Sequence, residues 1–226
     1  MRVSRIQAEE NRQTVIDVAS RLFREHGFDG IGLKDLMKGA GLTQGAFYKQ
    51  FQSKDDLAAQ ASRRALESAF GRWSAAAAAD PQDPLGAVIA FYLSMGHRAD
   101  RTDGCPVVAL GSDAARQSAD VKASFEAGIR KYLEMLGPWV GEPDGEEPGG
   151  KAMAILSTMI GAVLLSRAVN DERLSKRFLQ AGAERVLRES SSPTAGASSR
   201  SDRIEDAQGR LQAHRASKFL VVNGKP

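Results

Sequence analysis

The chain has 226 residues, 42% of them hydrophobic and 26% charged, so it can bury the core of one large domain or of two smaller ones. Its net charge of +3 and sequence pI of about 9.1 permit an anionic partner without arguing for one. The single cysteine, Cys105, excludes an intramolecular disulfide and a zinc cluster built on thiolates.

The sequence carries no signal for export or for membrane insertion. Its start lacks the apolar stretch of a signal peptide. The most apolar stretch, residues 152–165, is shorter than the ~20 residues that cross a bilayer. It also contains Ser157, Thr158 and Gly161. We therefore expect a cytoplasmic protein without a membrane partner.

Four helices are expected in the first third of the chain. Apolar residues recur at helical spacing through residues 7–27. Two short helices follow, near residues 33–39 and 44–51, and glycines separate them. A long helix is expected at residues 54–79, because Ser53 begins an S-x-x-D capping pattern.

Helices also dominate the rest of the chain, and strand patterns are nearly absent. Prolines start two of them, since proline is favoured in the first helical turn. The expected helices cover residues 84–98, 106–116, 119–137, 151–169 and 172–187. Residues 190–226 begin with the polar stretch SSSPTAGASSRSD and are expected to form a flexible tail. The predicted fold class is all-α.

The two short helices and the long one behind them form a predicted helix-turn-helix. Its small core would be built from the apolar residues Leu33, Leu36, Met37, Ala40, Leu42, Phe47 and Phe51. The second short helix then turns Gln44, Gly45, Tyr48 and Lys49 outward. A structural helical hairpin with a solvated polar face is the alternative.

The start of the second short helix suits the major groove of DNA. Thr43 is its expected N-cap, and backbone N–H groups beside it can meet a phosphate. Gln44 can make a bidentate contact to adenine. Gly45 costs the helix roughly 1 kcal/mol relative to alanine. That loss is understandable if the bare backbone lies close against DNA.

Further polar residues are candidates for phosphate contacts. Tyr48 and Lys49 follow on the same helix, and Lys54 stands at the start of the next one. Lys34, on the first short helix, is a phosphate ligand or a solvated lysine. Together these residues predict that the partner of the helix-turn-helix is double-stranded DNA.

Three segments of the sequence resemble the DNA-binding domain of TetR/AcrR-family transcriptional regulators: LFREHGFDG, GAGLTQGAFYKQF and SKDDL. The resemblance runs from about Glu9 to Ala69. It departs from the family pattern at Gly32, where threonine or serine is frequent, and at Gln50, where histidine is. We therefore predict a DNA-binding domain at residues 9–69, with its motif at about 32–51.

The resemblance also implies a helical ligand-binding and dimerisation domain, placed at residues 70–189. In the family, the last two long helices form a four-helix bundle across the dimer axis. The helices at about 151–187 suit this role, because the first of them is apolar around most of its circumference. A homodimer and a small-molecule effector are the implied partners.

Phe91, Met95, Cys105 and Phe125 are the candidate ligand contacts, although aromatic residues of this kind are more often core. Cys105 precedes a helix that begins at Pro106, where the helix dipole can raise the thiolate fraction. Cys105 could therefore sense an oxidant or electrophile, or it could be a small buried hydrophobe.

No catalytic motif, cofactor site or metal-ligand spacing is found, so an enzyme is not expected. The predicted function is a ligand-responsive, homodimeric transcriptional repressor. An activator or a nucleoid protein of the same fold is the rival among DNA-binding proteins. A thiol-based redox or electrophile-responsive protein centred on Cys105 is the rival from another class.

Overall fold

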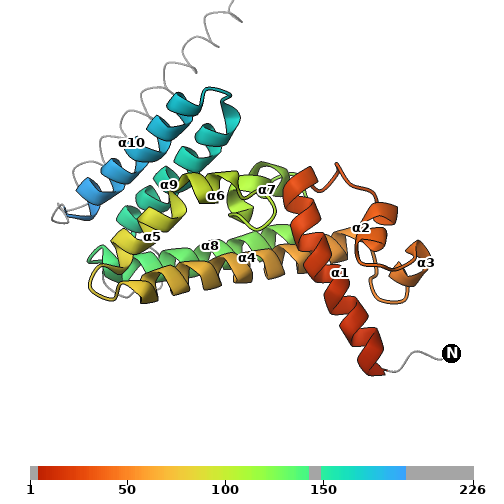
Figure 1. Cartoon of the computed structure of the whole chain (residues 1–226). Helices are drawn as coiled ribbons and strands as arrows, with labels where there is room; N and C mark the ends of the chain where they lie inside the picture. Colours follow the sequence, from red (N-terminus) through yellow and green to blue (C-terminus); the bar gives the residue numbers. More distant parts are fainter. Residues whose placement is uncertain (1–4, 143–148, 192–226) are drawn as a thin grey trace, which may run out of the picture. The chain divides into compact units, whose positions relative to one another are not determined.

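A computed structural model describes residues 5–142 and 149–191 of the chain, and that part is all-helical (Figure 1). Its helices are α1 (Arg5–His26), α2 (Leu33–Gly39), α3 (Gln44–Phe47), α4 (Lys54–Ala79), α5 (Pro84–Tyr92), α6 (Met95–Ala99), α7 (Pro106–Ala114), α8 (Ala119–Trp139), α9 (Gly150–Ala168) and α10 (Glu172–Ser190). The predicted fold class is confirmed. The predicted tail, apart from Ser190 and Ser191, lies outside the described residues.

Most helices begin and end where the sequence predicted, and three do not. The helix predicted at 84–98 is two helices, because Ser94 interrupts it and caps α6 by accepting a hydrogen bond from the His97 N–H (3.0 Å). α8 does not break at Gly137 and Pro138 but continues to Trp139. α3 is one turn long and ends at Phe47, four residues earlier than predicted.

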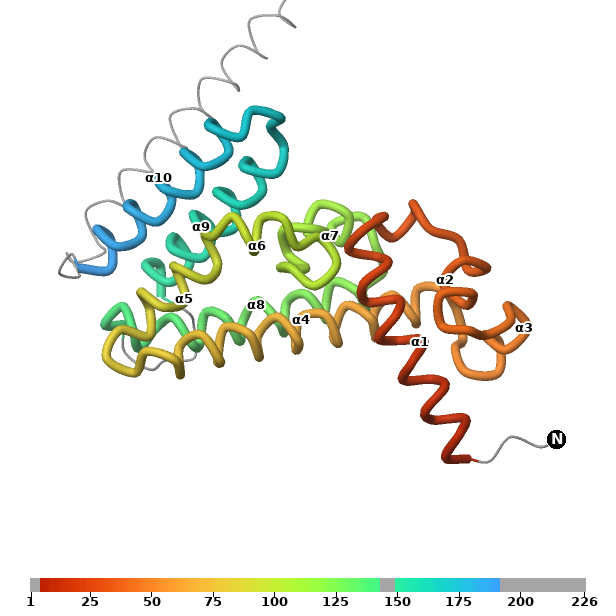
Figure 2. The backbone as a smooth tube through the Cα atoms, viewed as in Figure 1, coloured from red at the N-terminus to blue at the C-terminus, as the bar shows by residue number. Residues whose placement is uncertain are grey.

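Two pairs of long helices organise the described chain (Figure 2). α4 packs along α8, and α9 packs along α10. α1 packs across the first part of α4 and also contacts α2 and α7. Glycines let two of these contacts form closely: a Cβ at Gly182 would lie 2.7 Å from the Ala162 Cβ, and one at Gly128 would lie 2.8 Å from Leu66.

α4 joins the two predicted domains as one uninterrupted helix. Its first residues lie beside α2 and α3, and its last residues lead into α5 (Figure 1). Apolar residues of α4 are buried from Leu57 to Trp73, so the helix contributes to the core on both sides of the predicted boundary at residue 69. The boundary itself stays a prediction.

Candidate DNA-reading face and ligand cavity

The short helix α3 rests on buried aromatic rings. Phe47 is 1% exposed, and its ring stacks on Phe51 with centroids 5.4 Å apart. Phe51 in turn lies under the guanidinium of Arg12 from α1 (5.4 Å). A one-turn helix has little stability of its own, so this packing holds α3 in place.

The turn between α2 and α3 fixes the angle at which α3 is presented. Gly41 has φ +70°, a left-handed conformation that suits glycine, and the Leu42 N–H donates to the Met37 carbonyl at 2.9 Å. A Cβ at Gly39 would lie 3.0 Å from Val18 and 3.1 Å from Leu22, so α2 approaches α1 closely. The predicted helix-turn-helix is therefore present.

Most of the predicted DNA contacts face solvent. Six of them are exposed, namely Lys34, Thr43, Gln44, Gly45, Tyr48 and Lys49, whereas Lys54 is half-buried. We call the members of this set from Thr43 to Lys49, which lie on α3 and directly beside its two ends, the reading face. Tyr48 is 70% exposed and its ring stands edge-on to Phe47, which directs it outward from the aromatic base.

Gly45 has no packing reason to be glycine. A Cβ at this position would meet no atom within 4 Å, and its φ is not positive. The space above the backbone is therefore open toward solvent. The sequence interpretation of Gly45, that bare backbone serves a close approach from outside, agrees with this geometry.

The first turns of α3 and α4 are capped differently. Ser53 caps α4 as predicted, with its hydroxyl accepting from the Asp56 N–H (3.0 Å) while Asp56 accepts from the Gln52 N–H (3.1 Å). Thr43 occupies the N-cap position of α3, but its side chain makes no capping hydrogen bond. The Thr43 hydroxyl is therefore exposed and not engaged in capping.

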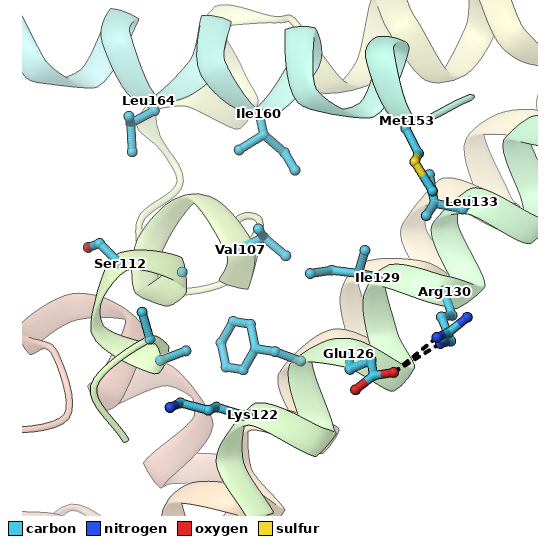
Figure 3. A pocket seen from close by; sticks show the side chains of 14 residues that line it. Val107, Ser112, Lys122, Glu126, Ile129, Arg130, Leu133, Met153, Ile160 and Leu164 are labelled. Carbon is cyan, nitrogen blue, oxygen red and sulfur yellow. Dashed lines mark hydrogen bonds and ion pairs between the residues drawn. The ribbon is translucent and has the colours of Figure 1, made fainter. Parts of the chain in front are cut away.

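A cavity of about 740 Å³ lies between α7, α8 and α9 (Figure 3). Its wall is mostly apolar, which suits a drug-sized organic molecule. The lining residues are Val107, Gly111, Ser112, Ala114, Ala115, Lys122, Phe125, Glu126, Ile129, Arg130, Leu133, Met153, Ile160 and Leu164.

Only Phe125 of the four predicted ligand contacts lines this cavity. Phe91 and Met95 are half-buried and pack against the hydrophobic core instead. Cys105 is 4% exposed and also belongs to that core. The aromatic and sulfur-containing residues chosen from the sequence did not identify the cavity, because most of them are packed in or against the hydrophobic core.

The cavity residues that sequence reasoning missed are mainly aliphatic. Met153, Ile160 and Leu164 point from α9 into the cavity (Figure 3), although the sequence analysis used the apolar circumference of this helix to support a dimer bundle. On α8, Ile129 and Leu133 follow Phe125 at intervals of four residues. That spacing was the available signal for a second apolar stripe.

α9 is long and apolar enough to span a membrane, the one such helix in the part of the chain that the structure describes. Ile155, Leu156, Met159 and Val163 belong to the buried core. A further stripe lines the cavity. These two surfaces account for most of its apolar character, as expected for a core helix of a soluble protein.

Arginines from three helices bind the segment between α6 and α7. Arg24 of α1 donates to the Gly104 carbonyl (3.0 Å), and Arg72 of α4 donates to the Asp103 carbonyl. Arg167 of α9 donates to the His97 and Asp100 carbonyls (3.0 and 2.8 Å). We call residues 97–105 the connector segment.

Arg24 is the most buried of these arginines. Its side chain is 1% exposed, and burial lowers its pKa to about 10 despite the nearby Asp103 carboxylate (3.5 Å). A second bond runs from its Nε to the Ser20 carbonyl at 2.9 Å. A buried cation with this many partners positions the end of α1 against the connector segment.

Cys105 ends the connector segment inside a buried polar cluster. Its N–H donates to His97 Nε2 (3.1 Å), whose Nδ1–H donates to the Tyr92 carbonyl (2.7 Å). The hydroxyls of Tyr92 and Tyr132 are buried; the Tyr92 hydroxyl interacts with the Cys105 thiol, and the Tyr132 hydroxyl has no hydrogen-bond partner within the described residues. Burial, together with Cys105, raises the pKa of both phenols.

No group of three or more metal-ligating side chains occurs among residues 5–142 and 149–191. The candidate site has two parts, the exposed reading face and the apolar cavity; α4 begins beside the first and packs on α8, which lines the second.

Residues 15–61 match the family described as bacterial regulatory proteins, tetR family. The chain is 43% identical over 56 residues to the HTH-type transcriptional regulator AcrR of Shigella flexneri, covering 25% of this chain and 26% of that one. It is 23% identical over 130 residues to the HTH-type transcriptional repressor NemR of Escherichia coli K12, covering 56% of this chain and 65% of that one. The matches thus span less than two thirds of both relatives.

Solved structures share the fold over a longer range. The reduced form of E. coli NemR superposes with a TM-score of 0.67 at 20% identity, covering 82% of this chain and all of that one. A TetR-family regulator from Cytophaga hutchinsonii gives a TM-score of 0.68 at 20% identity, covering 83% and 97%. Members of this family are regulators and not enzymes. Residues 15–61 therefore form a helix-turn-helix domain of the tetR family of bacterial regulatory proteins, and the described helices share the fold of solved TetR-family regulators.

Proposed function

We propose that the chain is a cytoplasmic, homodimeric repressor that releases its operator when a small molecule binds in the cavity. The observation that carries the DNA-binding part is the reading face, where exposed polar residues and an unpacked glycine stand on a buried aromatic base. Each subunit would place α3 in a major groove, with half-sites ~34–36 Å apart or a multiple of that.

We assign base reading to Gln44. The proposed phosphate contacts are Thr43, Tyr48, Lys49 and Lys54, and Lys34 on α2 is a further candidate for a phosphate contact. Gln44→Ala should cost ~1–3 kcal/mol and relax the preference at one base position. Lys49→Ala should weaken binding to all sequences alike and lower the salt slope by about 1.

The test is fluorescence anisotropy of the protein on DNA from upstream of its own gene, against an unrelated duplex and at two salt concentrations. Binding at least ~1000-fold tighter than to the unrelated duplex supports specific recognition. Gln82→Ala and Lys131→Ala are matched controls, because both side chains are exposed outside the helix-turn-helix. Equal losses from Gln44→Ala and Gln82→Ala would contradict the assignment of Gln44 to base reading.

The dimer is proposed to form through α9 and α10. Besides Leu164, which lines the cavity, three leucines of these adjacent helices remain exposed: Leu165 (46%), Leu174 (38%) and Leu187 (45%). Between the core face and the cavity face, α9 also turns Ser157 and Ala168 to solvent. Small residues beside leucines permit close packing of a second helix pair.

Leu165→Glu should weaken this dimer, because it would bury an unpaired charge at the interface. Analytical ultracentrifugation over a concentration series should show at least about a 10-fold higher dissociation constant, or ~1.4 kcal/mol. Ile6→Glu is the control, since Ile6 is 74% exposed on α1. An unchanged dimer in Leu165→Glu would place the interface elsewhere.

Release is proposed to follow from movement of the cavity wall relative to the helix-turn-helix. α7 forms one wall and begins at the end of the connector segment, to which Arg24 ties α1. α4 is a second connection between the two regions, because it runs from the helix-turn-helix along α8, which lines the cavity. A ligand can shift the equilibrium only by its differential affinity for the two arrangements, commonly ~1–3 kcal/mol.

A thiol-responsive protein centred on Cys105 is the second candidate. It is supported by the Tyr92 hydroxyl, which interacts with the buried Cys105 thiol, and by the buried Tyr132 hydroxyl, whose pKa Cys105 also raises. The 4% exposure of Cys105 counts against rapid reaction with an oxidant. If peroxide still releases DNA from Cys105→Ser as it does from the unaltered protein, this candidate is wrong.

A further inference from the structure

The cavity has an apolar interior and one charged edge. Along α8, Phe125, Ile129 and Leu133 face α7 and α9, where aliphatic side chains complete the wall (Figure 3). Three charged residues of the same helix, Lys122, Glu126 and Arg130, lie beside them at intervals of four residues. A ligand that fills the apolar interior therefore meets charge along one helix.

The charges on this edge do not cancel. The Glu126 carboxylate accepts two hydrogen bonds from Arg130, at 3.2 Å from Nε and 3.1 Å from Nη2. Glu126 and Arg130 thus neutralise each other. Within the described part of the chain, the structure gives Lys122 no carboxylate partner, and it is the remaining charged residue of the lining.

The position of Lys122 adds to this imbalance. It lies in the first turn of α8, where the helix dipole contributes further positive potential. Asp120 lies in the same turn of α8 but outside the lining, and Asp113 of α7 pairs with Arg116 at 2.6 Å. Neither carboxylate lines the cavity.

We propose that the effector is an apolar molecule carrying one carboxylate, which Lys122 binds while the apolar body fills the space between α7, α8 and α9. This proposal rests on the proposed function and specifies its ligand. The volume of about 740 Å³ falls within the ~300–1000 Å³ typical of small-molecule sites. A cationic ligand would meet a net positive edge, and a neutral one would leave Lys122 without a partner.

The experiment compares three molecules with the same ten-carbon body: decanoate, 1-decanol and decylamine. Each displaces the neutral apolar dye Nile red from the full-length protein. Decanoate should bind about 5-fold more tightly than 1-decanol, the upper range for an ion pair with an exposed lysine such as Lys122. Decylamine should bind most weakly.

Lys122→Met keeps the length of the side chain and removes its charge, so it should abolish the preference for decanoate. Lys131→Met is the matched control, because Lys131 is exposed on α8 but does not line this cavity. Gly111→Leu tests the location: a Cβ there meets only the Val107 methyl at 3.6 Å, and a larger side chain should weaken all three molecules alike.

Two outcomes overturn the proposal: equal binding of the three molecules, or an unchanged preference for decanoate in Lys122→Met. Failure of all three to displace the dye would also overturn it. DNA binding is measured separately by anisotropy. Selective binding of decanoate without release of DNA would support the ligand class and contradict the proposed repressor mechanism instead.

Discussion

The reading face and the cavity are built in opposite ways. On α3, recognition depends on side chains that project from a buried base, and Gly45 contacts no other part of the protein within 4 Å of its Cβ position. In the cavity, recognition depends on space that three helices leave unfilled. Residues of the reading face can therefore change without loss of stability, whereas Ala114, Phe125 and Leu133 of the cavity wall also belong to the core.

This difference indicates which residues contribute to recognition alone and which also contribute to the stability of the fold. Neighbouring residues of the helix-turn-helix, such as Phe47 and Tyr48, differ from 1% to 70% exposure. Around the cavity, Phe125 and Leu133 line the space and are also buried. Variants at such pairs of residues test whether recognition and stability depend on different side chains.

Phe47→Ala is expected to have the largest effect. Removing this buried ring should cost ~3–5 kcal/mol of the free energy of unfolding, since α3 loses its base. Urea denaturation measures that loss, and DNA binding should fall with it. Tyr48→Ala is the control: it should lower DNA affinity while stability changes by less than ~0.5 kcal/mol. Equal destabilisation by both changes would break the contrast between base and reading face.

Arg24→Met should have the next largest effect, because it leaves the buried Gly104 carbonyl without its donor. We expect a loss of ~1–3 kcal/mol in urea denaturation. Ligand binding in the cavity should persist while its ability to release DNA weakens. Arg64→Met, which removes an exposed pair with Asp17 (2.6 Å), should cost at most ~1 kcal/mol and leave release intact. Unaltered release in Arg24→Met would leave α4 as the path between the two sites.

Gly45→Leu should separate binding from stability. The open space around Gly45 accepts the side chain, and the helix gains up to ~1 kcal/mol from losing a glycine. DNA affinity should nevertheless fall at least ~10-fold, or ~1.4 kcal/mol, by anisotropy. Gly71→Leu on α4 is matched, because a Cβ there also meets nothing within 4 Å. A similar affinity in both variants would contradict the close approach of α3 to DNA.

The helix-turn-helix was predictable because its signals are local. The capping pattern at Ser53, the glycines around Gly41 and the spacing of Phe47 and Phe51 each act within one or two turns of helix. The structure bears out these elements and their core. It corrects only the length of α3 and the capping bond expected of Thr43.

The cavity was not predictable in the same way, because it depends on contacts between helices distant in the sequence. Periodicity shows that α9 is apolar on several faces, but it does not say which face meets a cavity and which meets the core. Met153 and Ile160 line the space, whereas Ile155 and Met159 are buried. Cys105 drew attention by its place before Pro106, and it lies within the core.

His97 gives the smallest expected effect, at the connector segment between the two regions. Burial lowers its pKa, and its neutral ring donates from Nδ1 to Tyr92 and accepts at Nε2 from the Cys105 N–H. Below pH ~6.5 the unfolded chain gains a proton that the folded protein resists. Stability from this residue is therefore present above that pH and is lost as the pH falls, by at most ~1.4 kcal/mol per pH unit.

Urea denaturation from pH 7.5 to 5 should show this slope in the unaltered protein and a smaller one in His97→Gln. His26→Gln, a change at an exposed histidine of α1, should retain it. If His97→Gln and the unaltered protein lose stability in parallel, the acid sensitivity arises elsewhere, and the connector segment holds α1 and α7 together independently of the charge on His97.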